Sequence, residues 1–318
     1  MNKVPYIYLD ENIIQYAYEN IIKIDNVNNV EWIFSDEHFN EIERSKSLKY
    51  LDVLKKLKAR RIQIKLNDKY QILNEAYIHE YKDPEEVYNE YKNNIALTNE
   101  NNIDFASLQV FMFGNKEIID IDQYVNDYIL SIENMMKPIF EYIKNTELKI
   151  SYKAKLDKLK EDLTNTLKIA STKIKPIEEI RKKIVGQHLS TLNIDSGLII
   201  DQIWSKIQEK NDKLPITKDQ FFGKERMPFL SDYDNWPLFL GISQCHSVLN
   251  YLGYWPDEGL KKISKIYGIN SDSSHIGHAA FCTGIISADD RLCKKAKAIY
   301  DYFKLPVEVI KMYLISKN

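Results

Sequence analysis

Three segments of the chain repeat one pattern, in which a short apolar run is followed by acidic residues and then by a segment with helical spacing. Residues 4–9 are apolar and aromatic and end at Asp10, and residues 13–22 carry isoleucine, alanine and tyrosine one helical turn apart. Residues 30–34 form a second, mostly apolar run, and residues 284–286 form a third. Such runs alternating with helical periodicity are typical of strands that alternate with helices. The pattern predicts an α/β fold.

The same pattern divides the chain into three parts. Residues 67–234 show helical periodicity almost throughout, whereas the segments before and after them carry the apolar runs. Residues 307–310 form a last apolar run with no other sheet to join, so we expect them to pair within the sheet founded by residues 4–9. We therefore expect one sheet flanked by helices, built by residues 1–66 and 235–318 and interrupted by a mostly α-helical insertion over residues 67–234. The elements expected in the first part are a strand at 4–9, a helix at 11–24, a strand at 30–34, a helix at 36–58 and a strand at 62–66.

Four acidic residues are placed to meet at one edge of this sheet. Asp10 and Asp289 follow strands, Glu41 lies in the helix after the second strand, and Asp272 opens a predicted helix. In an open α/β sheet, ligands bind in the crevice beyond the carboxyl ends of the strands. Four carboxylates in one such crevice indicate a bound metal ion, because without a cation they would repel one another.

Each of the four acids also has a purely structural explanation. Asp10 and Asp272 are each in position to cap a helix N-terminus. Glu41 can be one more charge on a solvated helix face. Asp289 can be an ordinary turn residue, in which case the adjacent Asp290 is the functional acid. The order of the four acids and their setting favour a shared metal site over four separate roles.

The segments that carry these acids resemble the motifs of the PIN and PIN-like nuclease family. The resemblance covers roughly the first 65 and the last 80 residues, and the long middle segment departs from the family pattern. The matching segments are residues 9–12 (LDEN), residues 35–42 with Glu41, Asp272 with His275 and Ala279, and residues 287–292 (SADDRL).

This resemblance implies a metal-dependent endonuclease that hydrolyses phosphodiester bonds, with RNA expected as substrate in preference to DNA. Asp10, Asp272 and Asp289 would be the catalytic metal ligands, and Glu41 would complete the shell. Mg²⁺ or Mn²⁺ would be the cofactor, because these hard cations prefer oxygen ligands and can activate a water molecule for attack on phosphate. The family suggests a bacterial toxin or a phage-defence nuclease as the setting.

Four further residues are candidates for positioning the acids or binding substrate. Asn12 would orient the aspartate two residues before it. His275, one helical turn after the third acid, either contacts substrate or is a hydrogen-bonded core histidine. Arg291 and Lys294 would contact phosphate.

Two alternatives remain open. If residues 272–283 are helical, His275, His278 and Cys282 lie at positions i, i+3 and i+7 of that helix. Cys245 and His246 could then complete a zinc shell. The spacing lacks the paired Cys-x-x-Cys arrangement that marks structural zinc sites. The alternative function is a noncatalytic PIN-like module that binds RNA or a partner protein through the helical insertion.

Composition limits the remaining classes. The 318 residues are 44% hydrophobic and 28% charged, which is typical of a globular protein. Three cysteines without framework spacing fit a reducing cytoplasm, and no apolar run reaches the roughly 20 residues of a membrane span. The net charge of −2 conceals basic clusters such as residues 291–297, so a nucleic-acid partner is compatible with it. No phosphate-binding loop or serine-hydrolase elbow is present. We expect a cytoplasmic protein, with a regulatory protein or a second copy as further candidate partners.

Overall fold

The computed structural model describes residues 4–24, 29–96, 104–142, 146–184, 186, 198–210, 215–227, 233 and 235–313. The chain divides into two compact units. The sheet unit comprises Met1–Tyr91, Arg181–Asp257 and Gly268–Asn318, and the helical unit comprises Lys92–Ile180 and Glu258–Tyr267. The sheet unit thus includes parts of the segment that we expected to be an insertion.

Six strands form one mixed sheet, which confirms the predicted α/β class. The spatial order is β4-β3-β2-β1-β5-β6, and each neighbouring pair is parallel except β3 and β4. Parallel strands with helices on both faces are buried and therefore apolar. The strands are β1 (Tyr6–Leu9), β2 (Glu31–Ser35), β3 (Arg60–Leu66), β4 (Ile72–Ile78), β5 (Gly284–Ser287) and β6 (Glu308–Lys311).

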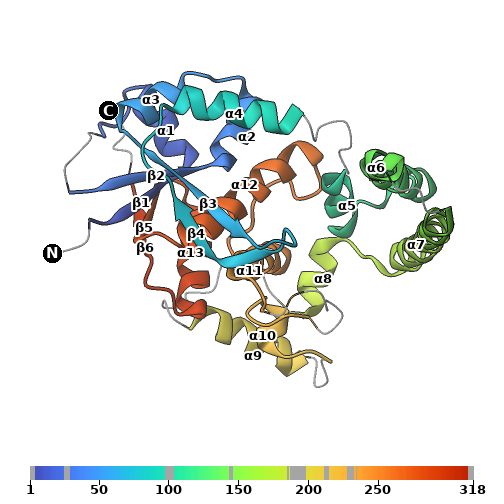
Figure 1. Cartoon of the computed structure of the whole chain (residues 1–318). Helices are drawn as coiled ribbons and strands as arrows, with labels where there is room; N and C mark the ends of the chain where they lie inside the picture. The colour runs from blue at the N-terminus through green and yellow to red at the C-terminus, as the bar shows by residue number, and fades with distance from the viewer. Residues whose placement is uncertain are drawn as a thin grey trace. The chain divides into compact units, whose positions relative to one another are not determined.

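The two ends of the chain share this sheet. β1 lies between β2 and β5, with Tyr8 opposite Ile33 on one side and Ile285 on the other. β6 pairs with β5 through Ile285 and Val309, which confirms that the last apolar run joins the sheet founded by the first. Figure 1 shows β1 in blue beside β5 in red, with β6 beyond β5.

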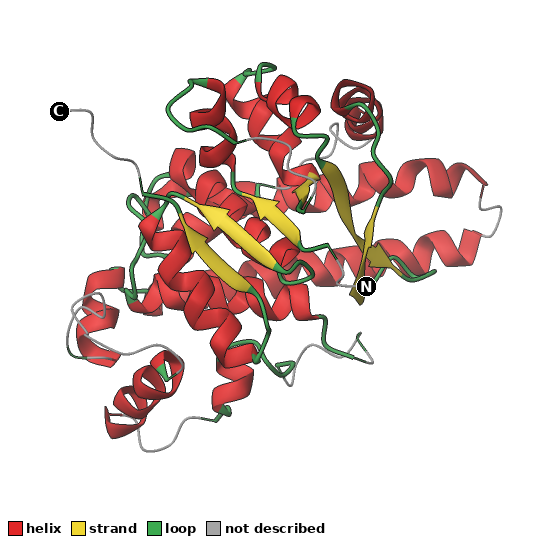
Figure 2. Ribbon diagram, turned by 90° about the vertical axis from the view of Figure 1, so that its left-hand side faces the viewer, coloured by secondary structure: helices red, strands yellow, loops and turns green. Residues whose placement is uncertain are grey.

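Helices of the sheet unit cover both faces of the sheet, and Figure 2 shows the strands running between them. Side chains alternate between the two faces of a strand. Tyr8, Ile33 and Ile285 point to the face that packs with residues of α9, α11, α12 and α13. The helices with all or part of their length in this unit are α1 (Glu11–Tyr18), α2 (Asp36–Ser45), α3 (Tyr50–Lys56), α4 (Pro84–Ala96), α8 (Ile177–Ile184), α9 (Ile199–Lys210), α10 (Lys218–Phe221), α11 (Leu238–Leu252), α12 (Ile263–Ala279) and α13 (Asp290–Phe303).

The helical unit has a small core of its own. Phe111, Val125, Ile129 and Leu167 pack together in it. Its elements include α5 (Phe105–Met112), a short 3-10 helix η2 (Lys116–Ile118), α6 (Ile121–Tyr142) and the 28-residue α7 (Thr146–Lys173).

Two expectations about the helices were wrong. The helix expected at residues 36–58 is divided into α2 and α3, because Lys46 adopts a left-handed conformation that ends α2. The helix expected to open at Asp272 begins nine residues earlier, at Ile263. Ile266 and Ile269 are buried upstream of Asp272, so the apolar stripe of α12 starts before it. Asp272 therefore lies inside a helix and does not cap one.

The expectation of an almost wholly helical middle segment was also wrong at its start. β4 adds an antiparallel edge strand, with Ala76 opposite Ile64 and Ile78 opposite Ile62. The sequence ILNEAYI alternates weakly, because an edge strand buries few of its side chains. Among the described residues, no helix combines the length and apolarity that a membrane span needs.

Replacing Ile285 by Ala tests whether the shared sheet carries the stability of this unit. Ile285 is 0% exposed at the centre of the core, so the change should lower the free energy of unfolding by about 2–5 kcal/mol. The matched control is Ile21→Ala, which removes the same atoms from a side chain that is 53% exposed and should change stability by under about 0.5 kcal/mol. Equal effects of the two changes in denaturant melts would contradict the assignment of the core.

Candidate active site

Asp10 stands at the carboxyl end of β1, where hydrogen bonds hold its side chain. Its backbone N–H donates to the Ile286 carbonyl (3.1 Å), so the pairing of β1 with β5 fixes its place. One carboxylate oxygen accepts from the Glu11 N–H (3.0 Å), and the other accepts from the Ser287 hydroxyl (2.5 Å) and the Asn12 amide. Asp10 therefore caps α1 and also presents a fixed, buried carboxylate at the edge of the sheet.

Asn12 joins the end of β1 to the turn after β5. Its amide nitrogen donates to Asp10 and to the Ser287 hydroxyl (3.2 Å), and its carbonyl oxygen accepts from the Ala288 N–H (2.9 Å). The Ser287 hydroxyl also accepts from the Asp289 N–H (2.9 Å). Two segments from opposite ends of the sequence are thereby fixed against each other around one carboxylate.

Glu41 approaches the same edge from α2 and meets His275 from α12. The His275 Nε2 lies 3.1 Å from each Glu41 carboxylate oxygen and 4.0 Å from Asp10 Oδ1. Burial alone would lower the pKa of His275, but the Glu41 charge and hydrogen bond, followed by the Asp10 charge, raise it to about 10. Burial alone would raise the pKa of Glu41, but His275 brings it below its usual value. The two groups therefore form a buried ion pair at neutral pH.

The protonated His275 extends into a buried hydrogen-bond chain. Its Nδ1 lies 2.8 Å from the Tyr8 hydroxyl, which lies 2.7 Å from the Ser35 hydroxyl. A charged imidazole donates from both nitrogens, so Tyr8 accepts from His275 and donates to Ser35. His38 stays neutral beside them, because burial and then the His275 charge lower its pKa to about 4, and its Nε2–H donates to the Leu9 carbonyl (2.8 Å).

Asp272 and Asp289 complete the set of four acids. Burial raises the pKa of Asp272 well above its usual value, and the charges on Asp257, Asp10 and Asp289 raise it further. Asp10 responds in the same way, since burial raises its pKa and the Glu41 and Asp289 charges add to the effect. The four acids therefore share one electrostatic environment. Asp289 is exposed and caps α13 by accepting from the N–H groups of residues 291 and 292 (2.6 and 3.0 Å).

The residues that follow Asp289 have contacts of their own. Asp290 pairs with Lys311 of β6, with 2.5 Å between Nζ and Oδ1. Lys294 is exposed and lies over the Trp255 ring, 5.5 Å from its centroid. Arg291 is half-buried in the first turn of α13.

The structure shows the hydrogen-bond partners of His275. It is buried, and its two nitrogens contact Tyr8 and Glu41, as the second expectation of a hydrogen-bonded core histidine describes. A second cationic side chain beside Glu41 comes from α2: the Arg44 guanidinium is 3.6 Å from Glu41 and donates to the Ser271 hydroxyl (2.7 Å).

Sequence reasoning missed two titratable groups here. Burial, followed by the Glu41 and Asp10 charges, raises the pKa of Glu11 to about 7. Its position directly after Asp10 was the signal. Lys295 belongs to the basic cluster at residues 291–297, yet it is buried and pairs with Asp257 (2.5 Å). Its helical position on the inner side of α13 was the signal there.

The zinc alternative has no assembled donor set. His278 donates from Nδ1 to the Ser274 carbonyl (2.8 Å), and burial lowers its pKa to about 4. Within the part of the chain that the structure describes, no three His, Cys, Asp or Glu side chains are arranged as a ready-made metal shell. Comparison of the chain with protein-family models, curated proteins and solved structures found no match.

The Glu41–His275 pair should give the stability a defined pH dependence. His275 has a raised pKa, so its contribution is complete below about pH 6.5 and is lost as the pH rises toward 10. Glu41 has a lowered pKa, so its contribution is present above about pH 4.5 and is lost at lower pH. Glu41→Gln should cost about 3–5 kcal/mol at neutral pH, because it leaves a buried charge unpaired.

Melting curves between pH 6 and 10 check this prediction. The wild type should lose stability as the pH rises, and Glu41→Gln should lose less, because its His275 is already neutral over more of that range. Glu86→Gln changes an exposed glutamate of α4 and should follow the wild type. Parallel pH profiles for the wild type and Glu41→Gln would show that the pair is not ionised in the protein.

Proposed function

We propose that the chain is a PIN-like, metal-dependent endonuclease that hydrolyses RNA. The order of the parallel strands, β3-β2-β1-β5-β6, supports this proposal, because it places the carboxyl ends of β1, β2 and β5 side by side. The acids that the family resemblance marks follow β1 and β5 or lie on α2 and α12.

One observation carries the proposal. Asp10 and Asp289 come from opposite ends of the sequence, yet both bond to the Ser287 hydroxyl, one through its carboxylate and one through its N–H. Glu41 and Asp272 add their charges to the same environment. Crowding buried carboxylates destabilises a fold, so a ligand that offsets the repulsion is expected at such a place.

The donor set fits Mg²⁺ or Mn²⁺ by its chemistry. These cations need only one or two carboxylates from the protein and keep several water molecules, so a complete protein shell is not required. Asp10, Asp272 and Asp289 would hold the cation, with Glu41 beside them. When bound, the cation would activate a water molecule and neutralise charge on the scissile phosphate.

The protein side chains have separate tasks in this proposal. Asn12 and Ser287 orient the Asp10 carboxylate, and His275 orients Glu41. Arg44, at the rim of the acids, is suited to hold a phosphate of the substrate strand. Arg291 and Lys294 keep their proposed role of phosphate contacts along α13. We place the reaction in the cytoplasm, where the three free cysteines stay reduced.

Cleavage of a labelled RNA pool by Asp289→Asn tests the proposal. The change keeps the size of the side chain and removes a charge that would hold the cation, so cleavage should fall by several orders of magnitude. Folding should be unaffected, because asparagine also caps helices. Asp290→Asn is the matched control, since Asp290 faces Lys311, and it should cleave like the wild type.

The outcomes separate the proposal from its alternative. If the Asp289→Asn variant is active and the Asp290→Asn variant is inactive, the fourth acid of the site is Asp290. Wild-type protein that binds RNA but does not cleave it with Mg²⁺ or Mn²⁺ would instead support the noncatalytic binding module.

A further inference from the structure

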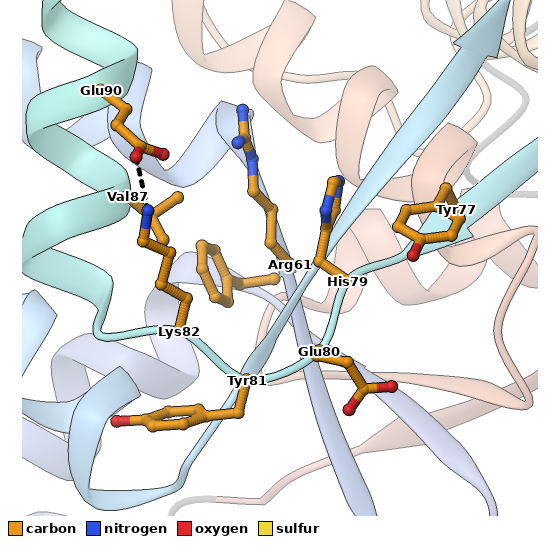
Figure 3. A pocket seen from close by; sticks show the side chains of 9 residues that line it. Arg61, Tyr77, His79, Glu80, Tyr81, Lys82, Val87 and Glu90 are labelled. Atoms are coloured by element: carbon orange, nitrogen blue, oxygen red, sulfur yellow. Dashed lines mark hydrogen bonds and ion pairs between the residues drawn. The ribbon is translucent and has the colours of Figure 1, made fainter.

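A polar pocket in the sheet unit is lined by residues other than the four acids. It has a volume of about 490 Å³, which is within the range of small-ligand sites. It lies between the β3–β4 hairpin, the segment after β4 and the start of α4, and buried Phe34 and Val87 line it. Figure 3 shows that Arg61 and His79 stand side by side, between a Lys82–Glu90 pair and Tyr77.

Asp36, in the first turn of α2, fixes two of the polar side chains behind this pocket. Its carboxylate accepts from Arg61 Nε (2.5 Å) and Nη2 (2.6 Å), which is a bidentate pair. It also accepts from the Gln63 amide nitrogen (3.1 Å). The Gln63 carbonyl oxygen therefore faces the other way, toward His79, with 2.7 Å to its Nε2.

These hydrogen bonds place a donor group of Arg61 beside an acceptor nitrogen of His79 in the pocket. Burial and then the Arg61 charge lower the pKa of His79, so the ring is neutral at pH 7. A carbonyl oxygen can only accept, so His79 donates from Nε2 and its Nδ1 carries the free electron pair. The bidentate contact with Asp36 uses Nε and Nη2 of Arg61, so Nη1 is the guanidinium nitrogen outside that contact, and Arg61 lines the pocket.

The walls of the pocket are aromatic and its charges are paired. Tyr77 is 52% exposed and meets the His79 ring edge-on, with 4.7 Å between centroids. Tyr81 is also exposed. Arg61 is neutralised by Asp36, and Lys82 is neutralised by Glu90 at 2.5 Å. Such a pocket suits a neutral, flat ligand with a polar edge better than it suits a phosphate group.

We propose that this pocket binds a single nucleobase. A nucleobase is flat enough to stack on tyrosine and histidine rings, and its edge sets a hydrogen-bond acceptor beside a donor, which complements Arg61 and His79. The base comes either from a free nucleotide or from an unpaired stretch of RNA. In the second case the pocket would hold the substrate strand of the proposed nuclease, but the proposal itself does not depend on cleavage.

Binding to the 318-residue chain in EDTA tests this inference without any metal. The probes are the four ribonucleoside monophosphates, followed by calorimetry, and a short fluorescent single-stranded RNA, followed by anisotropy. Tyr77→Ala should weaken binding about tenfold or more, because it removes a stacking surface. His79→Phe keeps a ring but removes the hydrogen bonds, and it should weaken binding similarly. The matched control is Tyr70→Ala, which truncates an 85% exposed tyrosine in the β3–β4 turn outside the pocket and should bind like the wild type.

The results identify the source of the base. Monophosphate binding that both pocket variants lose would indicate a free nucleotide, whereas RNA binding alone, lost in the same variants, would indicate a strand. Failure of both probes to bind, or binding that Tyr77→Ala and His79→Phe leave unchanged, would overturn the proposal. Asp289→Asn should bind both probes normally, so a loss of cleavage alone leaves this inference intact.

Discussion

The buried ion pair between Glu41 and His275 is the interaction on which the candidate site depends. It joins α2, which follows the second strand, to α12, which comes from the other end of the chain. A buried ion pair stabilises a protein only when its remaining hydrogen-bonding groups are satisfied. The Tyr8 hydroxyl accepts a hydrogen bond from the second nitrogen of His275 and donates one to Ser35 at the end of β2. The pair thus fixes both helices to the carboxyl edge of the sheet, where the acids gather.

That arrangement places more negative charge at the edge than the nearby cations balance. Arg44 and His275 face Glu41, while the more distant Lys295 is committed to Asp257. Burial raises the pKa values of Asp10, Asp272 and Glu11, and the charges of the neighbouring acids raise them further. A divalent cation would relieve the repulsion between these acids and would displace protons from them. This crowding of acidic side chains is what the cation of the proposed function would offset.

The sequence was a sufficient guide to the elements with strong periodicity. The apolar runs that became β1, β2, β5 and β6 were recognisable because buried parallel strands carry few polar residues. The start of α12 could not be recognised from the sequence, because the residues before Asp272 alternate serine, lysine and tyrosine with isoleucine. β4 was missed because an edge strand with Asn74 and Glu75 exposed has no clear alternation.

The candidate acids were predictable from their position after strands, but their partners were not. Asn12 and Ser287 lie at opposite ends of the chain, and only the pairing of β1 with β5 brings them to the same carboxylate. His275 illustrates the same limit, because its partner Glu41 lies 234 positions away. Sequence spacing indicates which face a residue occupies on its own helix, but it does not indicate what another helix places opposite.

Calorimetric titration with Mn²⁺ tests the central claim most directly. At pH 7 the wild type should bind Mn²⁺ saturably and release protons, because Glu11 has a pKa of about 7 and the pKa of Asp10 is raised. Repeating the titration in two buffers of different ionisation enthalpy measures the protons released. Asp10→Asn should abolish both effects, whereas Asp52→Asn, an exposed aspartate of α3, should preserve them. Absence of saturable binding to the wild type, or equal binding by Asp10→Asn, would contradict the account.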